Sequence, residues 1–505
     1  RGFLLSNATF GVVKFTDGSV ETYALQAEGA ISVIGIDNLS LSGAVTLRFN
    51  SFQEAIRESV STGDAVAPVE MAADETASLT GDAFFEIAGM DLALRVAGQA
   101  IAANVNISRY RSGDRQIFRA SLGEGLASFS VAETSLLTLE ELSGDVFIFD
   151  DGIAAQASGE LSFGIDSVLA SGVYNLQINT TGNTISESFT AGNVTREVSI
   201  PAGPYLRISG IGAELSVNGQ SLTGNFLFEQ NAEGDVVASA SEVHASFGDG
   251  ALTLVDAEGV ISINTAGLAA RVTGGIALTV PNVTIAADLD LKISTRSTTV
   301  DETIKINGVE KALQIRAGPT FALEATQVSV EIAGQTLTTD LIIEQTNPDL
   351  ANLSFSNASL NLNASGRTLA SITDATGNFE LSQAGLAGRL IINELLFDLP
   401  GLFFSVGSAE IQVNTRATEA SVAALPLPAG PFLRIALLDT TAELGRLDVA
   451  GVPARLNGNF FLEQANGITR IAASEVTAEV AVNGDEATLV NGRGALLIAE
   501  TGMPG

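Results

Sequence analysis

Residues 203–230, GPYLRISGIGAELSVNGQSLTGNFLFEQ, carry the pattern that decides the fold of this chain. The pattern returns at 318–345 as GPTFALEATQVSVEIAGQTLTTDLIIEQ, and at 430–464 as GPFLRIALLDTTAELGRLDVAGVPARLNGNFFLEQ. A more divergent copy begins at Gly81 and reads GDAFFEIAGMDLALRVAGQAIAANVNISR. Successive copies begin 122, 115 and 112 residues apart. Because a fixed period is the signature of a repeat protein, the sequence predicts a tandem array of one unit of about 115 residues.

The period divides the chain into five segments. They are a partial first repeat at 1–80, complete repeats at 81–201, 202–316 and 317–428, and a partial last repeat at 429–505. The chain begins and ends inside a repeat, so we expect it to be a section of a longer protein. Residues 52–60 have a weakly helical pattern, and the stretch up to Ala77 has no clear counterpart in later repeats, which predicts a surface insertion.

Strand and turn signals fill almost the whole sequence. Segments rich in Val, Ile, Leu, Thr and Phe alternate with polar residues, as in β-strands. Asn-Gly and Asp-Gly pairs favour two-residue hairpins between antiparallel strands; they begin at Asp17, Asp151, Asn218, Asp249, Asn307, Asn457, Asn466, Asn483 and Asn491. The prediction is an all-β chain of antiparallel meandering strands. Its repeats stack into an elongated rod, built either as β-sandwiches or as one continuous curved sheet.

Composition excludes several classes of function. The chain has 505 residues, 58 acidic against 25 basic side chains and a net charge of −33, which disfavours binding to nucleic acids or anionic membranes. It has no cysteine and one histidine, so disulfides, thiol chemistry and an imidazole zinc site are not available within one chain. The most apolar region, 386–406, is interrupted by charged residues and a proline, so no transmembrane segment is predicted.

Calcium is the one candidate ligand that the sequence suggests, and no cofactor is required. Four aspartates in polar turns offer oxygen ligands, namely Asp150, Asp151, Asp235 and Asp249. Calcium takes about six to eight such ligands. However, none of these turns has the spacing of a helix-loop-helix calcium site, and ordinary solvated turns explain the same residues.

The recurring Glu-Gln pair at the end of each copy is a second candidate site. Glu229, Glu344 and Glu463 begin these pairs. They either bridge adjacent repeats by hydrogen bonding or lie at exposed strand ends. An enzyme on this scaffold would need a unique pair of carboxylates about 5 to 10 Å apart. Because the acidic features repeat instead, the sequence predicts a protein that is not an enzyme.

The elements GPYLRI, FLFEQ, ASEV and INTAGLA of residues 203–269 resemble the long repeat arrays of giant bacterial secreted or cell-surface proteins of the adhesin type. This resemblance implies an extracellular or cell-surface structural protein that forms a stalk, filament or surface layer, with adhesion as a candidate role. Its expected partners are neighbouring repeats, copies of itself, and the cell surface or extracellular matrix. The alternating apolar strands are also similar to the β-groove lipid carriers of the AsmA type, which is the alternative function.

Overall fold

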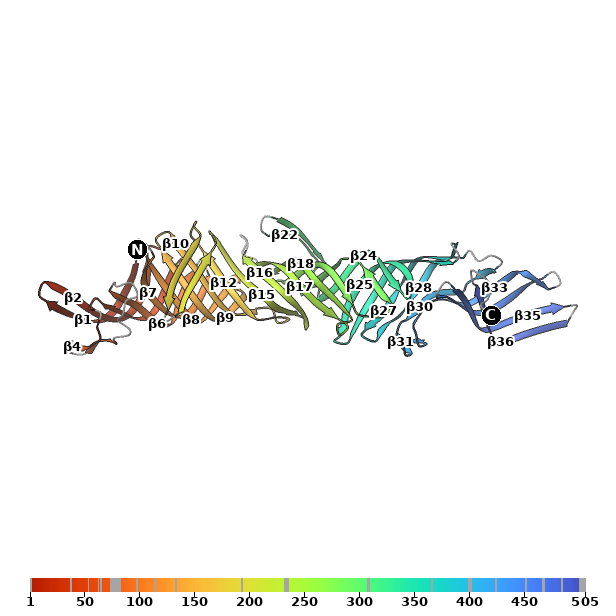
Figure 1. Ribbon diagram of the computed structural model, residues 1–505, viewed down its shortest axis with the longest axis horizontal. Coiled ribbons are helices and arrows are strands. Elements are labelled where there is room, and N and C mark those ends of the chain that lie inside the picture. The colour runs from red at the N-terminus through yellow and green to blue at the C-terminus, as the bar shows by residue number, and fades with distance from the viewer. Residues whose placement is uncertain are drawn as a thin grey trace. The chain divides into compact units, whose positions relative to one another are not determined.

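The computed structural model describes residues 2–498, except for 37–38, 53, 62, 64–65, 73–82, 97–98, 113–114, 132–133, 192–193, 231–235, 307–308, 365–366, 398–401, 423–424, 450–451, 466–467 and 483–484. Throughout this described part the regular structure is β-strand, with no helix (Figure 1). The prediction of an all-β chain is therefore confirmed. In the same residues, no helix has the length and apolar character that a membrane span needs.

The chain divides into two compact units. Unit 1 contains Arg1–Ser241, Val260–Ala269 and Thr295–Gln314, and unit 2 contains Glu242–Gly259, Ala270–Ser294 and Ile315–Gly505. Four strands have residues in both units: β17 (Val236–Phe247), β18 (Leu252–Asn264), β19 (Gly267–Leu278) and β23 (Val309–Ile315).

Unit 1 contains the complete strands β1 (Gly2–Asp17), β2 (Val20–Ile34), β3 (Leu39–Asn50), β4 (Ile56–Ser61), β5 (Val66–Met71), β6 (Phe84–Val96), β7 (Gln99–Ser112), β8 (Arg115–Val131), β9 (Thr134–Phe149), β10 (Gly152–Phe163), β11 (Val168–Ser171), β12 (Val173–Asn179), β13 (Ile185–Ala191), β14 (Val194–Ile200), β15 (Tyr205–Val217), β16 (Gln220–Gln230) and β22 (Val300–Ile306). Its main strands pair antiparallel in the order β1–β2–β3–β6–β7–β8–β9–β10–β12–β15–β16. β11 continues the line of β12, since both pair with β15.

Unit 2 repeats this plan with β20 (Val283–Ala286), β21 (Leu289–Ser294), β24 (Thr320–Ile332), β25 (Gln335–Asn347), β26 (Leu350–Ala364), β27 (Arg367–Ser382), β28 (Gly385–Phe397), β29 (Leu402–Ser405), β30 (Ser408–Asn414), β31 (Ala420–Val422), β32 (Leu425–Leu427), β33 (Phe432–Val449), β34 (Val452–Ala465), β35 (Ile468–Val482) and β36 (Asp485–Ile498). Antiparallel pairing runs β21–β24–β25–β26–β27–β28–β30–β33–β34–β35–β36.

Each unit thus holds a complete set of six strands followed by a separate hairpin, when β11 and β12 are counted as one strand, and likewise β29 and β30, which both pair with β33. In unit 1 the set is β6 to β12 with the hairpin β13–β14, and in unit 2 it is β24 to β30 with the hairpin β31–β32. Within each unit the main strands form one continuous antiparallel meander rather than two opposed sheets. The predicted meander is confirmed, and the predicted rod of stacked repeats stays a prediction.

Bulges bend the strands near their middles. The register shifts by one residue where a residue such as Asp91, Gln327 or Asp439 adopts a positive φ, between 49° and 55°. The backbone N–H of Gln327 is satisfied by Asp340 Oδ1 on the neighbouring strand, at 2.8 Å. Asn104 and Asn459 accept the corresponding N–H groups of the other two bulges at 3.1 Å. A bulge increases the local twist and bend of a strand, so these positions curve the sheet.

The curvature turns one apolar face of the sheet inward. In unit 1 the rings of Phe3 on β1 and Phe118 on β8 meet edge to face at 5.3 Å, although four other main strands, β2, β3, β6 and β7, lie between β1 and β8 in the sheet. In unit 2 the turn at Gly248 reaches β25, where Gln345 Oε1 accepts its N–H at 2.9 Å. Alternate side chains of β27, including Phe379 and Leu381, are fully buried, which is the pattern of a strand with one face in a core.

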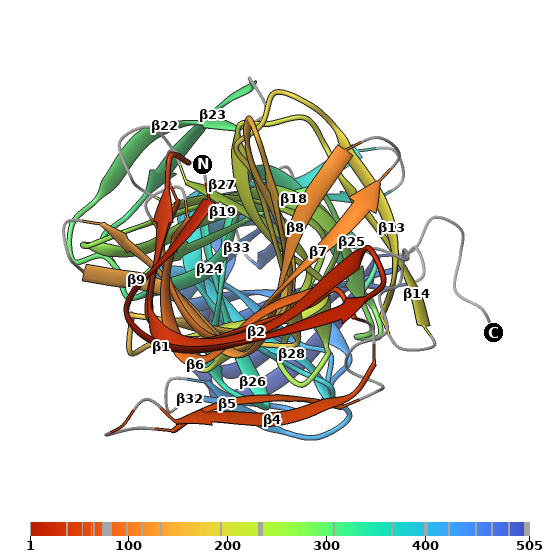
Figure 2. The same ribbon diagram turned by 90° about the vertical axis from the view of Figure 1, so that its left-hand side faces the viewer.

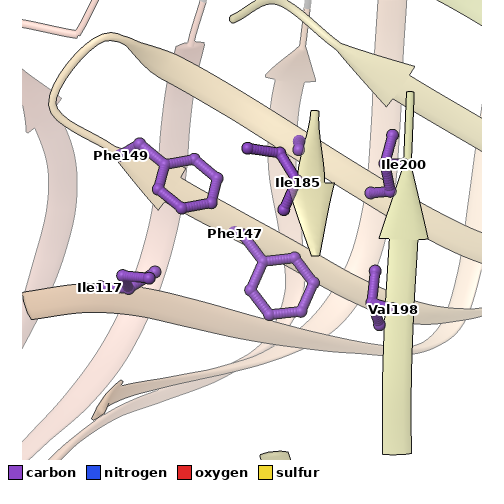
Figure 3. Close-up of a cluster of buried hydrophobic side chains, with 7 residues drawn as sticks. Ile117, Phe147, Phe149, Ile185, Val198 and Ile200 are labelled. Atoms are coloured by element: carbon purple, nitrogen blue, oxygen red, sulfur yellow. The ribbon is translucent and has the colours of Figure 1, made fainter. Parts of the chain in front are cut away.

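The separate hairpins cover parts of the opposite face. β13 and β14 place Ile185, Val198 and Ile200 over Phe147 and Phe149 of β9 (Figure 3). β4 and β5 lie beside β1 and β2 (Figure 2), where Ile56, Val69 and Met71 pack with Ala24. In unit 2, Ala420, Val422 and Leu427 pack with Ala387 in the same way.

The hairpin β4–β5 corrects two expectations for the first repeat. Residues 56–61 form strand β4 rather than a helix, because Ile56 and the alternate apolar positions of β5 bury against the sheet. The segment is also not an insertion peculiar to this repeat, since β13–β14 and β31–β32 follow the sixth strand in the same way.

Candidate functional site

A row of directly opposed residues crosses the sheet of unit 1 on the face that carries the hairpins. We call it the polar row; it consists of Glu28, Thr46, Ala88, Asn106, Ser121, Asp145, Gln156, Gln177, Arg207 and Glu229. Directly opposed side chains of an antiparallel sheet lie on one face and within reach of each other. All but Ala88 are polar, so the row is a candidate binding surface.

An ion pair lies at the centre of the polar row. Arg119 Nη2 lies 2.6 Å from Asp145 Oδ1, and the two side chains are only 15% and 7% exposed. Ser121 Oγ donates to the same carboxylate oxygen at 3.2 Å. Further along, Arg207 Nε donates to Glu229 Oε1 at 2.7 Å. These contacts hold the side chains of the row in fixed positions.

Two hollows open along the polar row. The first, of 640 Å³, extends from Glu28 on β2 to Ser121 and Gly123 on β8. The second, of 620 Å³, lies between the row and the hairpin β13–β14, with Gln156 on the sheet and Glu197 on the hairpin among its lining residues. Both volumes fall within the range of small-molecule sites, about 300–1,000 Å³.

A buried asparagine closes the base of the hairpin β13–β14. Asn179 is fully buried at the end of β12. Its Oδ1 accepts the N–H of Thr181 at 2.8 Å, and its Nδ2 donates to the carbonyl oxygens of Asn183 at 2.9 Å and Pro201 at 2.6 Å. Three hydrogen bonds of one side-chain amide therefore connect the residues just before the hairpin β13–β14 with the residue just after it.

Unit 2 uses the same closure. Asn414, at the end of β30, is fully buried and accepts the N–H of Arg416 at 2.9 Å. Its Nδ2 donates to Thr418 O at 2.9 Å and to Pro428 O at 2.7 Å. In both bases the following Gly-Pro peptide bond is cis.

A third base, before the hairpin β22–β23, carries a buried arginine. Arg296 is 3% exposed, and its Nη2 donates to Ser262 O at 3.1 Å and Oγ at 2.7 Å. Its Nε donates to Gly267 O at 3.2 Å, while Nη1 pairs with Glu302 Oε1 at 2.6 Å. The guanidinium thus joins the sheet to the hairpin.

The residue beneath the hairpin β31–β32 of unit 2 differs from its counterpart beneath β13–β14 of unit 1. Arg389 occupies the place on β28 that Gln156 has on β10, four residues after the glycine that begins each strand. Its Nη1 pairs with Glu410 Oε1 at 2.8 Å, and its Nη2 donates to Pro426 O of the hairpin at 2.9 Å. An arginine therefore bridges sheet and hairpin in unit 2, where unit 1 has the shorter glutamine.

The calcium candidates do not converge in the described residues. Asp150 and Asp151 are exposed in the turn between β9 and β10, where Asp151 Oδ2 accepts from Asn183 Nδ2 at 3.2 Å. Asp249 is exposed in another turn, and its backbone N–H donates to Pro348 O at 2.9 Å. Asp235 lies outside the described residues. No group of three or more potential metal-ligating side chains occurs in the described part of the chain, and the calcium hypothesis stays a prediction.

The Glu-Gln pairs take part in cross-strand contacts. Glu344 pairs with Arg316, the last residue of the preceding predicted repeat, and Gln345 accepts from Gly248 in that same repeat. Glu344 and Gln345 therefore bridge two predicted repeats, which is the first of the two interpretations of the Glu-Gln pairs. Glu229 and Glu463 pair instead with Arg207 and with Arg470, the latter at 3.7 Å, inside their own repeats.

Sequence reasoning missed the asparagine anchors. The similarity between QINTT at 177–181 and VNTR at 413–416 contained both Asn179 and Asn414. It was visible as a repeat match, but the partners are carbonyl groups up to 22 residues away, at Pro201 for example. A side chain that bonds to distant backbone leaves no local pattern of its own.

Tyr174 is the titratable group with the largest resolved change in unit 1. Burial raises the pKa of its phenol to about 12. The side chain is fully buried, and its hydroxyl has no hydrogen-bond partner among the described residues. Burial without a partner favours the neutral phenol.

Comparisons with known proteins do not place the chain in a family. No family model and no curated protein matches it. Among solved structures, the outer membrane transporter YddB from Escherichia coli aligns with 94% of this chain and 75% of its own, at 10% identity and a TM-score of 0.11. A likeness at this level carries no argument about fold or function.

Proposed function

We propose that this chain is a structural, extracellular repeat protein that contributes to a stalk, filament or surface layer. The observation that carries the proposal is the recurrence of one construction in both units: six antiparallel strands, a buried asparagine, a hairpin and a Gly-Pro opening. An even number of strands brings the chain back to the same direction after each repeat, so a further repeat continues the meander. A protein built this way gains length by gaining copies.

The ion pairs and the buried asparagines support this role. They join neighbouring strands and hairpins, as Arg389 does with Glu410 and Pro426. Backbone ladders and buried apolar faces then provide the stability, because the chain has no cysteine for disulfides. Acidic surface charge keeps such repeats soluble.

The lipid-carrier alternative requires an apolar face that is open to solvent along the strands. On β18 the apolar positions are closed instead. Leu252, Leu254, Ile261 and Ile263 of β18 are all fully buried. β18 thus offers no apolar face that is open to solvent, and we do not propose that function.

Removal of one whole repeat tests the structural role. Deleting 203–317 joins the end of one repeat directly to Gly318, which begins the next copy of the opening pattern. In the native host, immunogold labelling of an epitope placed before and after the array should show a shorter separation at the cell surface. The matched variant deletes only 205–247, an odd number of strands, and should fail to fold.

Two results would count against the proposal. One is an intracellular location of the native protein, shown by resistance to external protease on intact cells. The other is an unchanged epitope separation after deletion of the whole repeat from a folded protein.

A further inference from the structure

We propose that β1 of one molecule pairs with β36 of a second copy of this chain, and that this contact joins the molecules in series. The inference rests on the proposed structural role, for which it names the partner. Among the described residues, β1 pairs only with β2, and β36 only with β35. Each of the two strands therefore presents one free edge, and an unpaired edge of a sheet is a template for a further strand.

β1 and β36 are both copies of the fourth strand of the repeat, which is β9 in the first complete set, then β18, then β27. Each of these five strands has one non-glycine residue with a positive φ between 50° and 54°, namely Asn7, Glu141, Asp256, Asp374 and Asn491. β9 and β27 pair with a third strand on one side and a fifth strand on the other. In the described part of the chain, β1 has only its fifth-strand neighbour and β36 only its third-strand neighbour. The two free edges are thus opposite edges of equivalent strands.

Apolar positions that are closed in the inner copies are open on β1 and β36. Val12, five residues after the positive-φ residue of β1, is 44% exposed; its counterparts are at most 1% exposed, namely Val146, Ile261 and Phe379. Leu489, two residues before the positive-φ residue of β36, is 49% exposed; its counterparts are fully buried, namely Leu139, Leu254 and Ile372. A strand added at each free edge would remove this apolar surface from water.

Val12 belongs to the inner face of the sheet. The neighbouring Val13 points to the other face, where it packs with the hairpin β4–β5. The hairpin thus covers the outer face of β1, while the inner face stays exposed at Phe10 and Val12. The surface left for a partner is the free edge together with this inner face.

A glycine of the fourth strand marks how closely a neighbouring strand approaches. A Cβ on Gly144 would overlap Gln156 O of the fifth strand, and one on Gly377 would overlap Arg389 O. Gly494 is the same glycine on β36, three residues after the positive-φ residue. No described atom lies within 4 Å of its Cβ position. β36 therefore has space for a close neighbour along its free edge, and no described strand of the same molecule fills it.

β1 complements this space. It carries Phe10 where the other fourth strands have glycine, and the side chain is 61% exposed. Because opposite edges of equivalent strands meet, a shared inner face makes β1 and β36 parallel. With the two bulges aligned, residues of equivalent position lie side by side about 4.8 Å apart. Phe10 of one molecule then lies beside Gly494 of the next, and its ring fills the space that the glycine leaves.

The contact joins two different surfaces of the same chain. A molecule that is bound through β1 therefore keeps its own β36 edge available for another copy. Heterologous contacts of this kind produce rings or open series of molecules. The proposed stalk or filament can gain length in this way beyond the repeats of a single chain.

Sedimentation velocity of the whole chain from about 1 to about 100 μM tests the contact, and we expect the mean mass to rise with concentration. Phe10→Asp should weaken the association about tenfold or more, because it places a charge in the joint. Gly494→Val should have a similar effect, because it fills the space for the Phe10 ring. Both variants should fold, since Phe10 is exposed and the Cβ position of Gly494 is open.

The matched controls lie on strands that are paired on both sides. Met90→Asp replaces another exposed apolar side chain, on β6, and Gly123→Val fills another open glycine position, on β8. Both controls should associate as the native chain does. Equal weakening by a control and its edge variant would show that the effect is not specific to the two edges and would contradict the assigned contact.

Cross-linking identifies the two edges. The chain has no cysteine, so Phe10→Cys and Gly494→Cys each introduce a unique thiol. At high protein concentration, a short bis-maleimide should link a mixture of the two variants and neither variant alone. The inference is overturned if the native chain stays monomeric, if one variant links only to itself, or if both edge variants associate normally. A shorter epitope separation after deletion of the repeat would still support the structural role, so the two proposals fail separately.

Discussion

The hairpins β13–β14 of unit 1 and β31–β32 of unit 2 share their closure and differ in what lies beneath them. Asn179 and Asn414 make the same three kinds of bond, one to an N–H two residues on and two to carbonyl oxygens. Under the hairpins, however, unit 2 has the bridging Arg389 and unit 1 has Gln156 beside a hollow. The closure is thus the constant part of the repeat, and the covered surface is the part that varies.

The glycine after each hairpin should be the most sensitive position. A Cβ on Gly203 would overlap the carbonyl oxygen of Asn179, and one on Gly430 would overlap that of Asn414. We expect Gly203→Ala and Gly430→Ala each to destabilise their hairpin by about 4 kcal/mol, because the clash is with backbone. Native-state hydrogen exchange of β13–β14 and β31–β32 measures this. Gly182→Ala is the control, since nothing lies within 4 Å of its Cβ position.

Substitution of the asparagine anchors should have the second-largest effect on stability. Asn179→Ala and Asn414→Ala each leave one N–H and two carbonyl groups without their partner, which should cost about 2–4 kcal/mol. Hydrogen exchange should show equal losses in the two hairpins, and Asn→Asp should lose at least as much, because a buried carboxylate oxygen then faces the two carbonyl oxygens that Nδ2 served. A clear loss at one base with none at the other would break the proposed equivalence. Asn183→Ala, which removes only an exposed contact with Asp151, serves as the control.

Substitution of the residue beneath the hairpin β31–β32 should show how the two units differ. Arg389→Gln removes the bonds to Glu410 and Pro426 and should loosen β31–β32 by about 1–2 kcal/mol. Protection of the β31–β32 amides against hydrogen exchange reports the change, while β13–β14 serves as the internal reference. Unchanged protection would mean that the bridge contributes nothing to holding the hairpin.

The alkaline effect of Tyr174 should be confined to unit 1. The pKa of Tyr174 is raised to about 12. The neutral, buried phenol therefore contributes fully to the stability of the fold below its ordinary pKa of about 10, and this contribution disappears as the pH rises through 12. At pH 11 the loss should be about 1 kcal/mol, and Tyr174→Phe should abolish it. Ala409 occupies the equivalent place in unit 2, five residues before the anchor. Equal alkaline loosening of β12 and β30 would contradict this assignment.

The sequence was sufficient for the strand class because that class rests on local signals. Alternating apolar residues and Asn-Gly turns such as Asn218-Gly219 act within a few residues, and β15 and β16 meet at that turn with Val217 opposite Gln220. The bulges were harder to locate, because Asp91 and Gln327 take positive φ only when a neighbouring strand offers a side chain to their N–H.

The candidate site was largely beyond sequence reasoning. Asn179 bonds to Pro201 across a whole hairpin, and Arg119 meets Asp145 only through the register of β8 on β9. The sequence pointed instead to acidic turns such as Asp150 and Asp151, because a turn is recognised from residues that are neighbours in the chain. Strand β4 was mistaken for a helix since its pattern at 52–60 is short, and burial of Ile56 against the sheet decides its conformation.

Hydrogen exchange at the anchored amides tests the central claim most directly. The N–H groups of Thr181 and Arg416 donate to the buried asparagines, and those of Gly203 and Gly430 close the same bases by donating to Thr181 O and Arg416 O. If the closure is the constant part of the repeat, all four should exchange as slowly as the central amides of β12 and β30. Exchange as fast as that of the exposed turn at Gly219 would show that the hairpins are not built into the repeat.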